Sequence, residues 1–287
     1  MTVMLDMAES KTDAQPLSTR QSAPSPASGD VQFRLPISAE ALPYYIYRPA
    51  RLRRDRPPLV TVHGISRNGC EHAQNFAALA ERSGRLVVAP FFSRTQCPRY
   101  QKVVADGCRA DQALMATLVE VATQTGVTMR AFDLFGFSGG AQFAHRFAML
   151  HPARVRRLAL ASAGWYTFPT VEDPFPYGLS PDSKTGQHIL DSFDLFLRIP
   201  TLVLVGEQDT ERDAGLRKGS RVDPRQGFTR VERATRWAQA VRAAAEVRQL
   251  PAMIQSQTLE GCGHNFTHCV TRAALAERVG RWFGIAE

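Results

Sequence analysis

The sequence predicts an α/β fold, built as a doubly wound, mostly parallel sheet of about eight strands with helices on both faces. Short apolar runs rich in β-branched residues alternate with segments in which apolar residues recur at helical spacing. Because such strands are apolar on both sides, we expect both faces of the sheet to be covered. A chain of 287 residues with 44% hydrophobic and 22% charged residues has enough apolar side chains for a core of this size.

Several segments carry the strand pattern. They are residues 31–35, 44–47, 59–62, 85–90, 132–135, 158–161, 201–205 and 253–259. The first two alternate or are aromatic and β-branched, which is typical of a pair of strands. The later ones alternate with helical segments, which indicates parallel strands joined by crossover helices.

Helical spacing marks the connections between these strands. In residues 106–125, for example, Ala110, Leu114 and Leu118 fall on one helical face, with Asp111 and Glu120 expected on the exposed face. The other expected helices are residues 71–83, 141–150, 230–247 and 272–283.

The rest of the chain divides into a tail and one domain. Residues 1–29 are rich in Ser, Thr, Ala, Pro and Gln, so we expect a disordered N-terminal tail before a single domain of residues 30–287. Residues 165–198 break the alternation with aromatic residues among prolines, which indicates a small lid insertion. No basic start followed by an apolar core marks a secretory signal, and no apolar run approaches about 18 residues, so we expect a soluble, cytoplasmic protein without a membrane partner.

Cysteine content and charge exclude some classes of site. The five cysteines form an odd number without Cys-x-x-Cys spacing, which favours reduced thiols over a disulfide framework or a zinc site. A pair between Cys97 and Cys108, which could lie close on one loop, is the alternative.

The net charge of +8 is spread in small groups, so nucleic-acid binding is not expected, while an anionic substrate stays open.

A Gly-Phe-Ser-Gly-Gly motif at residues 136–140 follows the strand at 132–135 and precedes a helix. A serine at the tip of a tight strand-to-helix turn needs glycines beside it, and the turn pushes its hydroxyl outward. The following helix adds its N-terminal amides where an oxyanion would develop. Ser138 is therefore the candidate nucleophile, and the alternative is a serine that only caps the helix.

A serine nucleophile needs a base, and the base needs a carboxylate. Asp209 follows the strand at 201–205 and His264 follows the last strand, so both are expected at the edge of the sheet where Ser138 lies. Glu207 and Asp213 are the alternative acids, and His268 is the alternative base.

Other residues are expected around this edge. The loop after the strand at 59–62 offers the backbone amide of Ile65 to join that of Gly139 as an oxyanion hole, with His63 in a structural role beneath it. Trp165, Tyr166 and Phe168 follow the strand at 158–161 and are expected to line a substrate pocket or to pack the lid. The basic loop at 210–226 is expected to rim the entrance and attract anionic substrates.

Four elements thus occur in order: His63-Gly64, the serine motif, Gly206-Glu207-Gln208-Asp209 and Gly263-His264. In these elements the chain from about residue 31 resembles the α/β-hydrolase superfamily. Within that superfamily it looks most like the esterase branch of dienelactone-hydrolase-like and polyhydroxyalkanoate-depolymerase-like proteins. Dienelactone hydrolases carry a cysteine nucleophile where this chain has Ser138, which counts against their substrate.

The resemblance implies hydrolysis of a carboxylic ester, through an acyl-serine intermediate and without a cofactor. A small-molecule ester would be the partner, and the sequence does not indicate an oligomeric state. Two other functions stay open: an acyltransferase that uses the same residues, and a non-catalytic binding protein on the same fold.

Overall fold

The computed structural model describes residues 29–105 and 107–285. Residues 1–28 of the expected N-terminal tail lie outside the described residues. The main sheet has the strand order β1-β2-β4-β3-β7-β8-β9-β10. Its strands are β1 Val31–Arg34, β2 Tyr44–Tyr47, β3 Leu59–Val62, β4 Val87–Pro90, β7 Phe132–Phe137, β8 Val155–Ala161, β9 Thr201–Gly206 and β10 Ile254–Leu259.

The pairing confirms the expected mostly parallel sheet. β2 pairs antiparallel with β1 and with β4, while β4, β3, β7, β8, β9 and β10 pair in parallel in that order. The carboxyl ends of the parallel strands therefore meet at one edge, which is where Ser138 follows β7.

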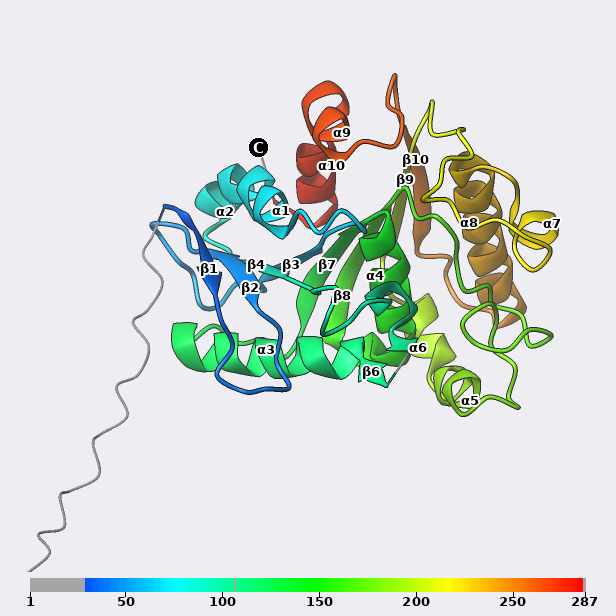
Figure 1. Cartoon of the computed structure of the whole chain (residues 1–287), viewed down its shortest axis with the longest axis horizontal. Helices are drawn as coiled ribbons and strands as arrows, with labels where there is room; N and C mark the ends of the chain where they lie inside the picture. The colour runs from blue at the N-terminus through cyan, green and yellow to red at the C-terminus, as the bar shows by residue number, and fades with distance from the viewer. Residues whose placement is uncertain (1–28, 106, 286–287) are drawn as a thin grey trace, which may run out of the picture.

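Helices cover both faces (Figure 1). They are α1 Gly69–Asn75, α2 Ala77–Ser83, α3 Ala110–Thr125, α4 Gly139–Leu150, α5 Lys184–Leu190, α6 Phe193–Leu197, α7 Asp223–Gln226, α8 Arg230–Val247, α9 Phe266–Ala273 and α10 Leu275–Trp282. Apolar side chains of α3, α4, α6 and α8 form the core on one face, and those of α2, α9 and α10 form the core on the other.

Two expected helices are each divided in the structure. The segment at 71–83 consists of α1 and α2, which meet at Phe76, a residue with φ −99° and ψ 1°. The closing segment begins earlier than expected and consists of α9 and α10, which meet at Ala274 in the left-handed region with φ 50°. Apolar periodicity continues across such breaks because both halves pack on the same core, so the sequence pattern does not reveal them.

The expected lid segment supplies the crossover from β8 to β9, and it includes α5 and α6. Asp111 and Glu120 do not form an exposed face of α3, which corrects that expectation. Asp111 is fully buried and pairs with Arg109 at 2.7 Å and with His151 at 2.8 Å. The Glu120 carboxylate accepts hydrogen bonds from the backbone amides of Ile37 and Ser38.

The cysteines also differ from the expectation of reduced thiols. Cys97 and Cys108 form a disulfide, which joins the loop after β4 to a small hairpin of β5 Val104–Ala105 and β6 Cys108–Arg109. Cys70, Cys262 and Cys269 are free. Free cysteines and a disulfide therefore coexist, because pairing depends on how the loops pack and not on the cysteine count.

Candidate active site

Ser138 lies between β7 and α4, at a turn that only this pattern of glycines allows. Its φ of 54° and ψ of −115° place a non-glycine residue in strained backbone geometry. A Cβ on Gly136 would lie 2.3 Å from the Gly140 carbonyl oxygen, and a Cβ on Gly140 would lie 2.0 Å from that of Val62. The Ser138 hydroxyl makes no capping hydrogen bond to α4, so the capping alternative is wrong.

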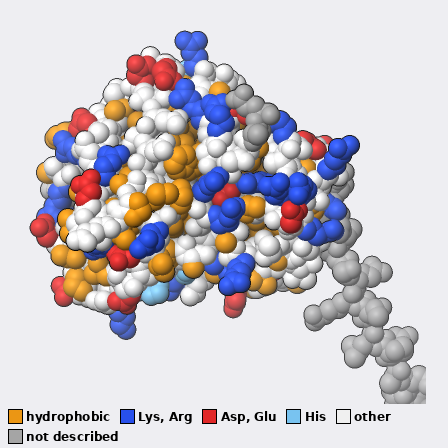
Figure 2. Space-filling model, turned by 180° about the vertical axis from the view of Figure 1, so that it is seen from behind, with side chains coloured by type: hydrophobic (Ala, Val, Ile, Leu, Met, Phe, Trp, Pro, Cys, Tyr) orange, Lys and Arg blue, Asp and Glu red, His pale blue; other side chains and the backbone are white. Residues whose placement is uncertain are grey.

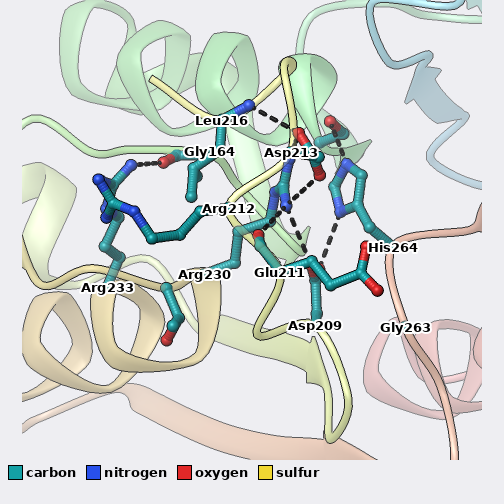
Figure 3. Close-up of polar contacts among 12 residues, drawn as sticks. Gly164, Asp209, Glu211, Arg212, Asp213, Leu216, Arg230, Arg233, Gly263 and His264 are labelled. Carbon is teal, nitrogen blue, oxygen red and sulfur yellow. Dashed lines mark hydrogen bonds and ion pairs between the residues drawn. The ribbon is translucent and has the colours of Figure 1, made fainter. Parts of the chain in front are cut away.

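Ser138, His264 and Asp209 form a continuous chain of hydrogen bonds, although they lie 55 or more residues apart in the sequence. Ser138 Oγ lies 2.9 Å from His264 Nε2. On the other side of the ring, His264 Nδ1 lies 2.8 Å from Asp209 Oδ2 (Figure 3). Asp209 is 1% exposed, and the His264 ring stacks on Phe137 with centroids 5.4 Å apart.

The alternative residues occupy other positions. Glu207 accepts a hydrogen bond from the backbone amide of Gly261 at 2.9 Å. Asp213 contacts Arg230, and His268 is an exposed residue of α9. Of these acids and bases, the structure brings only Asp209 and His264 into line with Ser138, but their catalytic roles stay predictions.

The two candidate oxyanion amides are neighbours. A Cβ on Gly139 would lie 3.3 Å from the Ile65 nitrogen. Gly139 is the first residue of α4, where a backbone amide has no acceptor within its own helix. Within residues 29–105 and 107–285, no acceptor takes a hydrogen bond from either amide. Both donors can therefore serve an oxygen atom that approaches Ser138.

His63 supports this loop from below. Its Nδ1 lies 2.8 Å from the Gly64 carbonyl oxygen, and the Phe92 amide donates to its Nε2 at 3.1 Å. Tyr100 donates its hydroxyl proton to the His63 carbonyl oxygen at 2.7 Å. Burial lowers the pKa of His63 to about 4, so the ring is neutral at pH 7, with its proton on Nδ1. These contacts agree with the structural role that the sequence predicts.

Arg230 is a site residue that the sequence reasoning missed. This first residue of α8 is 1% exposed, and its Nη1 lies 3.2 Å from Asp209 Oδ1. The same guanidinium holds Asp213 through contacts of 2.8 and 3.0 Å (Figure 3). Its hydrogen bonds lower the pKa of Asp213 to about 2. An arginine at the positive end of a helix dipole is unfavourable without an acidic partner. The position of Arg230 at the start of a predicted helix was therefore the sequence signal that a carboxylate lies beside it.

A cavity of about 410 Å³ opens at Ser138. Its walls combine polar side chains with a few apolar ones, and they are formed by Gly64, Ile65, Ser66, Asn68, Glu71, Phe137, Ser138, Asp213, Gly215, Arg230, His264, Asn265, Phe266 and Thr267. Asn68 donates to Glu71 at 2.7 Å, and the Thr267 hydroxyl donates to the same carboxylate. Two carboxylates therefore face the cavity, Glu71 from the first turn of α1 and Asp213 from the loop after β9.

Trp165, Tyr166 and Phe168 do not line this cavity, which corrects the expectation that they form its pocket. Tyr166 is fully buried and stacks on Trp237 with centroids 4.8 Å apart. The Trp165 ring is 3% exposed and packs against the guanidinium of Arg146. Trp165 and Tyr166 therefore pack the crossover segment onto α4 and α8, while Phe168 is half-buried.

The basic loop at 210–226 borders the cavity through Asp213 and Gly215 and not through its arginines. Arg212 pairs with Asp223 at 2.9 Å, and Arg225 pairs with Asp173. Attraction of anionic substrates by this loop stays a prediction. Within the described chain, no group of His, Cys, Asp and Glu side chains is arranged to hold a metal ion.

No family model matches the sequence, and no curated protein matches it. Among solved structures, a poly(aspartic acid) hydrolase from Sphingomonas sp. KT-1 has a TM-score of 0.76 at 23% identity, over 88% of this chain and 99% of that one. LpqC, a poly(3-hydroxybutyrate) depolymerase from Bordetella parapertussis, has a TM-score of 0.73 at 29% identity, over 91% and 93%. An S-formylglutathione hydrolase from Agrobacterium tumefaciens has 0.54 at 14% identity, over 90% and 95%. Their folds match this chain along most of its length.

Proposed function

We propose that this chain, a member of the α/β-hydrolase superfamily, is an esterase that uses Ser138 as nucleophile, His264 as base and Asp209 as the acid that orients the base. The observation that carries the proposal is the continuous hydrogen-bond chain, with 2.9 Å between Ser138 Oγ and His264 Nε2 and 2.8 Å between His264 Nδ1 and Asp209 Oδ2. The strained turn at Ser138 supports it, because strain of this kind is concentrated at functional sites.

The reaction proceeds in two steps. His264 Nε2 takes the proton of the Ser138 hydroxyl while Oγ attacks the ester carbonyl carbon, and the amides of Ile65 and Gly139 hold the resulting oxyanion. Collapse of this intermediate breaks the bond to the alcohol, which leaves with the proton from His264. Water then attacks the acyl-serine with His264 again as base, and this step releases the acid and restores Ser138.

Ester hydrolysis is favoured over transfer to another acceptor. The His264 side chain keeps 23% of its surface exposed, so water can reach the base that must activate it. A poly(3-hydroxybutyrate) depolymerase and an acetyl xylan esterase are among the similar structures, and both names refer to ester bonds. A carboxylic ester is therefore the substrate class for this chain.

A fluorophosphonate probe tests the nucleophile. We expect a mass increase on Ser138 in the folded wild-type protein and none in Ser138→Ala, with His264→Ala labelled far more slowly. Turnover of 4-nitrophenyl acetate should fall by about 10⁴-fold or more in both variants.

Ser66→Ala is the matched control, because Ser66 lines the same cavity and donates its hydroxyl proton to Asn68 Oδ1 at 3.1 Å. This variant should keep its labelling and turnover. Folded wild-type protein that neither reacts with the probe nor hydrolyses the ester would overturn the proposal.

A further inference from the structure

Arg146 is a fully buried arginine of α4 that pairs with no carboxylate among the residues that the structure describes. Its Nε donates to Thr167 Oγ1 at 2.9 Å, and its Nη1 donates to the Gln101 carbonyl oxygen at 2.6 Å. Its Nη2 is buried and makes no hydrogen bond to any residue that the structure describes. A guanidinium out of water with an unused donor is costly, and a bound anion is one group that would satisfy it.

Two more cations lie beside Arg146. The guanidinium carbon of Arg146 lies 4.0 Å from the centroid of the Trp165 ring, and that of Arg217 lies 5.4 Å from the same centroid. Lys102 follows directly after Gln101, whose carbonyl oxygen holds Arg146. Across residues 29–105 and 107–285, none of these cations has a carboxylate within ion-pair distance.

The cations affect one another. Burial lowers the pKa of Arg146 to about 9, and the charge of Arg217 contributes to this change. Burial also lowers the pKa of Lys102, with further contributions from Arg99, Arg217 and Arg146. A bound anion would relieve this repulsion, so the cluster of Lys102, Arg146 and Arg217 has the electrostatics of an anion site.

Two connections lead from the cation cluster towards Ser138. The Arg146 side chain points back along α4, because its Nη1 also donates to the Gln142 carbonyl oxygen at 3.2 Å. Gln142 lies one helical turn after Ser138, and a turn rises by about 5.4 Å. On the other path, Arg217 is two residues after Gly215, which lines the cavity at Ser138.

We propose that the cluster of Lys102, Arg146 and Arg217 binds a carboxylate carried by the same substrate molecule whose ester bond Ser138 attacks. This proposal rests on the proposed esterase function and specifies its substrate class as an ester with a carboxylate several bonds from the reacting carbonyl. Trp165 and Tyr177 hold Arg217 at the cluster, since its guanidinium carbon lies 5.4 and 5.5 Å from their ring centroids.

Chromogenic half-esters test this subsite. The 4-nitrophenyl half-esters of succinate, adipate and sebacate are compared with the corresponding methyl 4-nitrophenyl diesters, which lack the free carboxylate. We expect kcat/KM to favour the adipate half-ester over its methyl diester by about tenfold, with a smaller preference for succinate because its carboxylate lies fewer bonds from the reacting carbonyl. Added salt should reduce the preference, since it screens the charges.

Substitutions then identify the cations involved. Arg217→Met and Lys102→Met should each remove most of the preference for the adipate half-ester and leave the methyl diester unaffected. Arg212→Met is the matched control on the same loop, because Arg212 is neutralised by Asp223 at 2.9 Å. An active enzyme that hydrolyses both adipate esters equally, with no effect of Arg217→Met, overturns the subsite.

A binding measurement separates the subsite from the esterase activity. Monomethyl adipate should bind the Ser138→Ala protein, and Arg217→Met in that background should weaken binding by about tenfold. This outcome would support the subsite even if the wild-type protein failed to hydrolyse esters. Inorganic phosphate that binds as tightly as monomethyl adipate would overturn the proposal, because the cluster would then select for charge alone.

Discussion

Arg230 shows how a single side chain can position the candidate catalytic acid. Asp209 is buried, so the oxygen that does not face His264 needs a partner, and Arg230 Nη1 supplies it at 3.2 Å. The same guanidinium binds Asp213 with two hydrogen bonds, which fixes its orientation. Arg230 is therefore a positioning residue that acts through Asp209.

Substitution of Arg230 should separate positioning from substrate binding. In Arg230→Met, Asp209 keeps one buried oxygen without a donor, so we expect kcat on 4-nitrophenyl acetate to fall by about a hundredfold with little change in KM. Steady-state kinetics measure both constants.

The controls for this prediction lie on the same network and the same helix. Asp213→Asn keeps the contact between Arg230 and Asp209. If Arg230→Met lowers kcat through Asp209, then Asp213→Asn should lower kcat by less than about tenfold. Arg236→Met replaces an exposed arginine of α8 and should not change kcat. An unchanged kcat in a folded Arg230→Met protein would show that Arg230 does not position the acid.

At the scale of residues, the sequence predicts those side chains that follow strand ends. Ser138, Asp209 and His264 each come directly after a strand or its short turn, and parallel strands bring these ends together. Arg146 lies inside a helical pattern and Arg230 begins another, and an arginine in a helix usually faces solvent. The position of Arg230 at the start of a helix is a local signal that it needs an acidic partner, but the burial of both arginines depends on which loop packs over each helix, and the local pattern does not contain this information.

At the scale of elements, the disulfide between Cys97 and Cys108 fixes the segment that carries Tyr100. Tyr100 contacts the loop of His63, and its hydroxyl would lie 3.0 Å from a Cβ on Gly139. The disulfide thus lies in the segment that supports the candidate oxyanion hole. Disulfides persist mainly in oxidising compartments, so this one gives no support to a cytoplasmic location, which stays a prediction.

Removal of this disulfide should lower stability. A sequence separation of 11 residues closes a short loop, for which the chain-entropy model predicts a loss of about 3 kcal/mol in the free energy of unfolding. Urea unfolding of a Cys97→Ser, Cys108→Ser double variant measures the loss, and Cys70→Ser serves as the control because Cys70 is free. Equal stabilities of the wild-type protein with and without dithiothreitol would contradict this prediction.

The divided helices belong to the same scale. The sequence predicts a helical region before β4 and another after β10, and the structure contains helices in both places. The breaks at Phe76 and Ala274 are absent from the pattern because local backbone angles, set by packing on the sheet, determine them. Element type was thus predictable, while the boundaries depended on tertiary contacts.

At the scale of the whole molecule, buried histidines make stability depend on pH. Burial lowers the pKa of His63 to about 4 and lowers the pKa values of His72 and His145 well below the ordinary range. In the unfolded chain these rings bind protons near pH 6.5. Below that pH the unfolded state therefore binds more protons than the folded state, so stability falls as pH decreases.

We expect the free energy of unfolding to be greatest above about pH 6.5 and to decrease towards pH 4.5. His63 alone should account for about 3 kcal/mol of the decrease by pH 4. Urea unfolding at several pH values measures this slope. Asp213 and Asp223, whose pKa values arginine hydrogen bonds lower to about 2, lose their contributions only below about pH 4. A flat profile between pH 6.5 and 4.5 would contradict the prediction.

The surface shows how the net charge is distributed. Lysine and arginine side chains are spread over the face that Figure 1 turns away, with a denser group on one side (Figure 2). No described helix is long and apolar enough to cross a membrane. The net charge of +8 does not describe the surroundings of single arginines. Arg146 donates to the Thr167 hydroxyl, Arg217 lies near the Trp165 ring, and Arg230 pairs with Asp209.

The sequence by itself determined the fold class, the order of the strands along the chain and the residues that follow strand ends, because periodicity and turn chemistry are local properties. Only the tertiary structure decided which aromatic side chains are packed away, which cysteines pair, and that Arg230 and Arg146 are buried. These outcomes depend on contacts between segments that are distant in the sequence, and such contacts form when the faces of the sheet are covered.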